Sequence, residues 1–266
     1  MRKGAVAWVT GLIGVAALTL PGLALAQEGA LPNFSGLWAR STTAGGRTFN
    51  PPDTGPGPVM VVADANGFRI GDYTNPILLP HAAEAVKAHG DLGRAGEVAL
   101  PAWSLCWPAG VPLILNAVDP IQILQDPNYV VILHRGDMQV RRISLNAQAP
   151  ADIEPSWYGY SVGHYEGADT LVVETVGQND RALVDRFGTP RSESIRVVER
   201  YTISPDRSEL RVEFTVEDPK TFTSPWSANV TYSEATEPFV ERVCAENNKD
   251  PGGGIFPIPE DAAADF

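Results

Sequence analysis

Four side chains that can donate or accept protons stand close together in the middle of the sequence: Tyr158, Tyr160, His164 and Glu166. Alternate residues of a β-strand share one face, so a strand through this segment places all four on the same side. A carboxylate two positions after a histidine can orient the imidazole and raise its basicity, as general acid–base catalysis requires. The spacing therefore predicts a catalytic set, on condition that this face points into the fold.

The same pattern has a structural interpretation that the sequence leaves open. Tyrosine and histidine are commonly half-buried in proteins, and a strand can use them for packing with one satisfied hydrogen bond. Glu166 would then only brace the turn at Gly167.

Further residues are candidates for contact with a ligand rather than for proton transfer. Arg141 would supply a fixed cation and Glu199 a second carboxylate, and Trp157 and His134 complete the candidate ligand-binding residues. With the catalytic set, they would surround a small apolar or aromatic molecule. The chemistry that fits is a cofactor-free isomerisation, elimination or hydration, so an enzyme of this kind would be a lyase or an isomerase.

Other chemistries lack the residues that they need. His164 and Glu166 give only two metal ligands on one face, with His134 as a distant third, whereas zinc sites generally need three or four. Gly159-x-Ser161-x-Gly163 matches a nucleophile elbow, but that motif requires a strand followed by a helix, and here a hairpin turn follows. Gly252–Gly254 has no lysine and no helix after it, as a phosphate loop requires. We therefore predict no metal and no cofactor.

The N-terminus predicts export. Arg2 and Lys3 precede an apolar run from about residue 5 to 20, and Ala24-Leu-Ala26 is a pattern that signal peptidases cleave. The run is shorter than the roughly 18 apolar residues that a membrane anchor needs. Residues 1–26 are thus expected to be a signal peptide, and the mature chain periplasmic or secreted. The formal net charge of −12 argues against nucleic acid as a partner.

The chain has two cysteines, Cys106 and Cys244, and both follow the predicted signal. In an oxidising compartment two lone cysteines most simply form a disulfide. Two free buried thiols are the alternative.

Polar turns and alternating apolar residues predict a mostly β fold with one short helix at 80–89. Strands are expected at 34–39, 59–62 and 68–70, and hairpins at 129–133/138–145, 158–166/170–176, 195–203/210–216 and 228–232/239–243. Successive hairpins favour an antiparallel meander, which at this length must curl or close into a barrel. We expect one domain over 27–249, with an irregular arm at 27–120, a core at 121–248, and a flexible tail at 250–266.

Several motifs occur together in the second half of the chain. A Cys-x-Pro-x-Gly-x-Pro element lies at 106–112 and a Gln-x-Pro-x-x-Val-x-x-Leu strand at 125–133. Residues 159–175 are similar to Gly-x-Ser-x-Gly-x-Trp-Glu-Gly-Asp-Thr-Leu-Val-Val-Asp-Thr, with Tyr165 in place of the Trp and Ala168 inserted. By these motifs, residues 101–248 resemble an uncharacterised family of bacterial exported proteins. The resemblance implies an exported, lipocalin-like β-barrel and no particular activity.

The sequence thus supports two hypotheses on function. The first is an exported barrel that encloses a small apolar or aromatic molecule, with or without catalysis. The second is a non-enzymatic ligand-binding or envelope protein that contacts a partner through aromatic loops around Trp103, Trp107 and Trp226.

Overall fold

Short polar turns join the alternating segments in the second half of the chain, and they form the hairpins that such turns favour. In the computed structural model, β5 (Tyr129–His134) pairs with β6 (Gln139–Leu145), and β7 (Tyr160–Glu166) pairs with β8 (Thr170–Val176). A third hairpin joins β9 (Arg196–Ile203) and β10 (Glu209–Glu217). These three predicted hairpins are confirmed.

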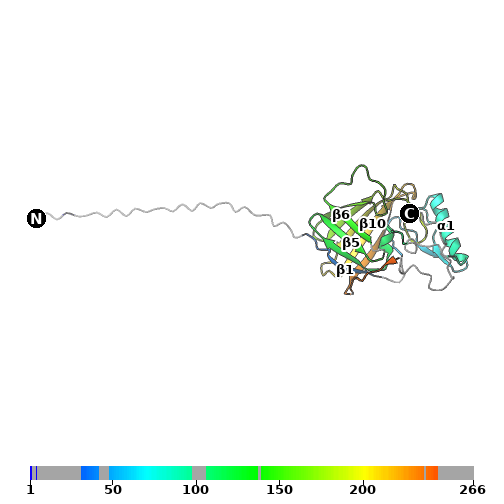
Figure 1. Ribbon diagram of the computed structural model, residues 1–266, viewed down its shortest axis with the longest axis horizontal. Helices are drawn as coiled ribbons and strands as arrows, with labels where there is room; N and C mark the ends of the chain where they lie inside the picture. The colour runs from blue at the N-terminus through cyan, green and yellow to red at the C-terminus, as the bar shows by residue number, and fades with distance from the viewer. Residues whose placement is uncertain are drawn as a thin grey trace. The chain divides into compact units, whose positions relative to one another are not determined.

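The strands close into a barrel. The structure describes residues 1, 4, 31–41, 48–97, 106–136, 139–236 and 238–244. The barrel has the order β1-β11-β10-β9-β8-β7-β6-β5-β4, and β1 (Gly36–Arg40) closes it by pairing with β11 (Trp226–Glu234) and with β4 (Ile121–Gln125). Figure 1 shows the barrel strands around a common axis. The predicted mostly β barrel with one short helix is confirmed.

One pair of neighbouring strands departs from the predicted antiparallel meander. β6 and β7 run parallel and pair only through Ile143–Leu145 and Ser161–Gly163. Parallel neighbours need a crossover connection, and residues 146–159 provide it by returning the chain to the barrel end where β6 began. The connection contains Pro150 and Pro155, which do not favour a paired strand.

The fourth predicted hairpin is wrong. The first half lies within β11, but residues 239–243 form no strand. The free edge of β11 is taken instead by β1, with Trp38 opposite Glu234 and Arg40 opposite Tyr232. The N-terminal strand therefore occupies the place that the sequence assigned to the C-terminal segment.

Alternation along the strands determines which side chains fill the barrel. On β9 the buried residues are Val197, Glu199, Tyr201 and Ile203, while Arg200 is exposed. The same period buries large aromatic residues on β1, β10 and β11, namely Trp38, Phe214, Trp226 and Tyr232. Large side chains therefore occupy the interior, in a single apolar cluster that also includes parts of the arm.

The helix and a small hairpin lie outside the barrel. α1 spans Pro80–Arg94 and packs on β3 (Arg69–Gly71), which pairs with β2 (Val61–Ala63). The helix is longer than predicted, because it continues through Gly90. A Cβ atom at that position would lie about 3.0 Å from Ile70, so the glycine allows the helix to pack closely on β3. Figure 1 shows α1 beside the barrel. Within the described part of the chain, no helix has the length and apolarity needed to cross a membrane.

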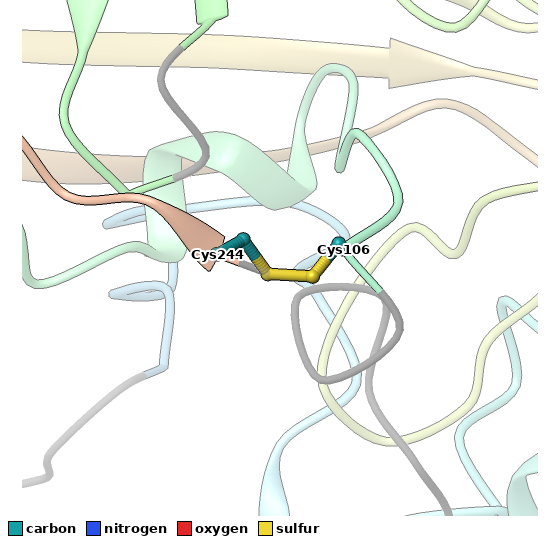
Figure 2. Close-up of a disulfide and its surroundings, with 2 residues drawn as sticks. All are labelled: Cys106 and Cys244. Atoms are coloured by element: carbon teal, nitrogen blue, oxygen red, sulfur yellow. A yellow bond between two sulfur atoms is a disulfide. The ribbon is translucent and has the colours of Figure 1, made fainter. Parts of the chain in front are cut away.

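The predicted disulfide is confirmed. Cys106 and Cys244 are bonded, with their Cα atoms 5.6 Å apart (Figure 2). The bond joins the segment before the barrel core to the segment after β11, so it closes most of the barrel into one covalent loop. Apart from residues 1 and 4, the predicted signal peptide and the predicted tail lie outside the described residues, as does Trp103.

Removing this disulfide should destabilise the fold. The two cysteines are 138 residues apart, and for a loop of that length the chain-entropy model gives at most about 5 kcal/mol. We expect Cys106→Ala/Cys244→Ala to unfold at a clearly lower urea concentration than the oxidised wild type. Dithiothreitol should lower the midpoint of the wild type to that of the double variant and leave the variant unchanged. An equal midpoint for oxidised and reduced wild type would contradict the prediction.

Candidate functional site

A buried ion pair lies inside the barrel. The guanidinium of Arg141 on β6 binds the carboxylate of Glu199 on β9 through both of its terminal nitrogens, one of them at 2.8 Å. The side chains are 1% and 0% exposed. Both residues were predicted as ligand contacts, and the structure brings them together as partners of each other.

Hydroxyl groups complete the hydrogen bonds of this pair. Arg141 donates to Thr175 Oγ1 at 2.7 Å and to Ser161 Oγ at 3.3 Å, and these two hydroxyls are 2.9 Å apart. Tyr201 donates to Glu199 at 2.8 Å. The network joins β6, β7, β8 and β9, because each of these strands turns its alternate residues inward.

Burial and charge determine the protonation of the network. Burial alone would lower the pKa of Arg141, but Glu199 and Tyr201 together more than offset this effect and raise it. Burial, and then the charge of Glu199, raise the pKa of Tyr201 well above its ordinary value. The guanidinium of Arg141 therefore stays charged and the phenol of Tyr201 stays neutral at physiological pH.

His134 also lies inside the barrel, on β5 opposite Ile121 of β4. It is 2% exposed, and neither ring nitrogen has a hydrogen-bond partner in the described structure. Burial lowers its pKa to about 3, with a further contribution from the charge of Arg141. The imidazole is thus neutral, and it is a poor proton carrier near neutral pH.

A pocket of about 410 Å³ opens at the seam between β6 and β7. We call it the seam pocket. It is lined by Tyr129, Val140, Arg141, Arg142, Ser144, Tyr158, Gly159, Tyr160 and Ser161. Arg141 and Ser161 are almost fully buried, so they form its floor, and the exposed Val140 and Arg142 lie at its rim. The pocket exists because the parallel pairing of β6 and β7 begins only at Ile143 and Ser161.

Arg142 and Tyr129 are among the residues of this pocket that were not predicted from the sequence. The guanidinium of Arg142 lies over the ring of Tyr129, 3.6 Å from its centroid. The available signal was the Arg141-Arg142 pair in a strand, since adjacent strand residues point to opposite faces. One arginine had to face inward and the other outward.

The predicted catalytic set is divided by the structure. Tyr160 shares the outer face of β7 with His164 and Glu166, but only Tyr158 and Tyr160 line the seam pocket. His164 and Glu166 lie farther along the strand, with side chains 54% and 46% exposed. At about 3.3 Å per strand residue, His164 lies roughly 13 Å from Tyr160 along the strand. The condition that the His164 face points inward is not met: Ser161 and Gly163 are the buried residues of β7.

His164 and Glu166 do contact each other as expected, at 3.3 Å. Glu166 also accepts from Arg200 at 2.7 Å, and the hydrogen bonds from Arg200 and then His164 lower its pKa. Glu166 therefore takes part in an exposed cross-strand cluster, and catalysis by His164 remains an untested prediction.

The predicted aromatic residues have different surroundings. Trp157 packs against Trp107, with ring centroids 5.7 Å apart, and Arg181 lies 5.5 Å from the Trp157 ring. Trp107 is 44% exposed. Trp226 is 2% exposed and belongs to the core, so its own side chain is not part of an exposed aromatic surface, whereas contact through the loop around it stays a prediction.

A second buried arginine holds the barrel end next to the pocket. Arg191 donates to the carbonyl of Trp157 at 3.1 Å, to the carbonyl of Asn179 at 2.7 Å and to Gln178 Oε1 at 3.0 Å. A side chain at Gly110 would lie 2.3 Å from Arg191 and 2.6 Å from the Trp157 carbonyl. Gly110 is therefore required for this contact, which fixes the chain immediately before Tyr158.

Among the described residues, no group of three or more His, Cys, Asp or Glu is placed to hold a metal ion. No protein-family model matches the chain, and no curated protein is similar to it. The arrangement of the side chains is therefore the basis for any proposal on function.

Breaking the buried ion pair from one side should be costly. Arg141→Met leaves the Glu199 carboxylate buried without its cation, which typically costs about 3 to 5 kcal/mol. The double variant Arg141→Met/Glu199→Met removes both charges and should recover much of that loss, as measured by urea unfolding at pH 7. Arg69→Met, at an exposed arginine outside the barrel, is the control. Additive losses in the double variant would contradict the coupling.

His134 should make the protein less stable in acid. Its pKa of about 3 lies below the ordinary 6.5, so the unfolded chain binds the proton first and stability falls as pH drops from 6.5 to 3. The fall amounts to about 5 kcal/mol at most. The variant His134→Leu should not show this loss of stability when urea unfolding is measured between pH 7 and pH 4.

The quantity to compare is the difference in unfolding free energy between wild type and His134→Leu at each pH. Asp185 is present in both proteins and acts in the opposite direction to His134, so its contribution cancels in this difference. Burial raises the pKa of Asp185 to about 6, so its folded form binds a proton first and stability rises as pH drops from about 6 to 4. Parallel profiles for wild type and His134→Leu would show that His134 is not buried in its neutral form.

Proposed function

We propose that this chain is an exported β-barrel that binds a small aromatic or apolar molecule in the seam pocket. The observation that carries the proposal is the pocket itself, in which three tyrosines surround a volume of about 410 Å³. Ligand sites are typically clefts of about 300 to 1,000 Å³ with aromatic walls and a few fixed polar groups. Tyr129, Tyr158 and Tyr160 are such walls, and the floor formed by Arg141 and Ser161 is fixed by the buried network.

The rim of the pocket favours a ligand with an acidic group. Arg142 is held against Tyr129, and it makes no ion pair within the described residues. Its charge is therefore available to a carboxylate or sulfonate on the ligand. An aromatic ring between the tyrosines, with its acidic group at Arg142, would use both features of the site.

Binding explains the arrangement better than turnover does. Arg141 is committed to Glu199, and His164 lies outside the pocket. Export is supported by the disulfide, since such bonds persist in oxidising compartments, and by the signal-like N-terminus. The resemblance to bacterial exported proteins agrees with both, and we propose membership of that family.

The test uses 8-anilinonaphthalene-1-sulfonate, an aromatic sulfonate of suitable chemistry, with the purified protein. We expect saturable fluorescence enhancement, with affinity about ten-fold weaker in Tyr160→Ala and in Arg142→Ala, because one lost aromatic or charged contact typically costs 1 to 2 kcal/mol. Arg142→Ala removes both the charge and the contact of Arg142 with the Tyr129 ring. Tyr129→Ala removes the ring and keeps the charge, so comparing the two variants separates their contributions to affinity.

Arg69→Ala is the matched control, because Arg69 is an exposed arginine on β3, outside the barrel. Its affinity should equal that of the wild type. Unchanged affinity in all three pocket variants, in proteins with unchanged urea midpoints, would exclude the seam pocket as the binding site.

A further inference from the structure

Arg40 is a further buried arginine, and no carboxylate of the described residues pairs with it inside the barrel. Arg40 ends β1 opposite Tyr232, whose side chain belongs to the core. The guanidinium donates to two backbone carbonyls, those of Leu115 and Thr48, the latter at 2.9 Å. Burial lowers its pKa, and Tyr232 provides the counteracting electrostatic effect. The acceptors of Arg40 are therefore neutral groups, and no acid among the described residues forms an ion pair with it.

The carboxylate of the buried network already has a cation. Glu199 forms the ion pair with Arg141, and the phenols of Tyr201 and Tyr232 stay neutral because burial raises their pKa values. Two guanidinium groups thus face one carboxylate in this interior layer. A buried charge without a counter-charge is strongly unfavourable, so one negative charge would complete the layer.

Unpartnered donors accompany this charge. Nε of Arg40 has no hydrogen-bond partner, nor has either ring nitrogen of His134, in the part of the chain that the structure describes. A neutral imidazole carries one N–H, so His134 adds a second donor. Asn116, which follows the Leu115 carbonyl bound by Arg40, is buried and has both amide atoms unpartnered.

The topology places Arg40 and His134 in one region of the interior. They lie on β1 and β5, with only β4 between them. The charge of Arg141 acts on His134, and the charges of both Arg40 and Arg141 act on Tyr232. Trp38 is paired with Ile121, and Ile121 is paired with His134. Arg40 lies two residues beyond Trp38 on β1, so Arg40 and His134 lie near the same end of the barrel interior.

We propose that a monovalent anion, either chloride or the carboxylate of a small molecule, binds inside the barrel between Arg40 and His134. This interior site is separate from the seam pocket and does not depend on the function proposed for it. The anion accepts hydrogen bonds from Arg40 Nε and from the imidazole N–H and balances the second guanidinium.

The experiment measures urea unfolding of the purified protein in sodium methanesulfonate, which is neither a halide nor a carboxylate, with methanesulfonate replaced stepwise by chloride, bromide or formate at constant ionic strength. We expect a saturable rise in the midpoint. The unfolding constant should fall about 100-fold when the anion reaches one hundred times its dissociation constant. A rise with formate alone identifies a carboxylate as the natural occupant, and a rise with the halides identifies chloride. Midpoints that do not respond to any of these ions would overturn the proposal.

Variants locate the site. Arg40→Gln and His134→Leu should lose the saturable response, whereas Arg69→Gln, at an exposed arginine, should keep it. An equal response in all four proteins would also overturn the proposal, because it would reflect ions at the surface. If Arg40→Gln does not fold, bromide-soaked crystals of the wild type decide: an anomalous peak beside Arg40 supports the site, and an ordered water there without bromide rejects it.

Discussion

The ion pair between Arg141 and Glu199 is the constraint on which the rest of the barrel depends. β6 and β7 share only a short parallel ladder, so backbone hydrogen bonds alone do not hold the seam together. The side chain of Arg141 crosses it, reaching Ser161 on β7, Thr175 on β8 and Glu199 on β9. A buried pair is tolerated only when its geometry is good and its remaining hydrogen bonds are made. The network thus fixes four strands relative to one another, and the seam can open into a pocket without loss of the barrel.

The same pair selects the strand register. A slip of one residue exchanges the two faces of a strand. On β9 such a slip would bury Arg200 in place of Glu199, so two guanidinium groups would meet inside the barrel. Val198 would replace Val197 at little cost, but the same slip would put Thr202 in place of Tyr201 and Ser204 in place of Ile203. The apolar cluster and the charged residues therefore both favour the observed register. Arg40 and His134 extend this polar layer to β1 and β5, where its hydrogen bonds remain incomplete.

Much of this fold could be predicted from local sequence, because hairpins depend on short turns and alternation. The division of β7 into two faces was also correct. Which face is inner could not be derived, because each carries polar and aromatic residues: Ser161 and Tyr165 on one, Tyr160 and His164 on the other. Gly163 distinguishes them, since a side chain there would lie 2.9 Å from Ile143 and 3.0 Å from the Val172 carbonyl. That crowding comes from neighbouring strands and is visible only once the strands are assembled.

The parallel pairing at the seam was unpredictable for a related reason. The connection 146–159 has no periodicity of its own, and its end is held by Arg191, a residue distant in sequence, through the carbonyl of Trp157. That guanidinium fits only because Gly110 lacks a side chain, and Gln178 binds both the amide and the carbonyl of the adjacent Val111 at 2.9 Å. The glycine of the Cys-x-Pro-x-Gly-x-Pro element is therefore explained by a contact that positions Tyr158. The element that carries the disulfide and the wall of the seam pocket are parts of one packed unit, so the covalent bond and these contacts hold the pocket together.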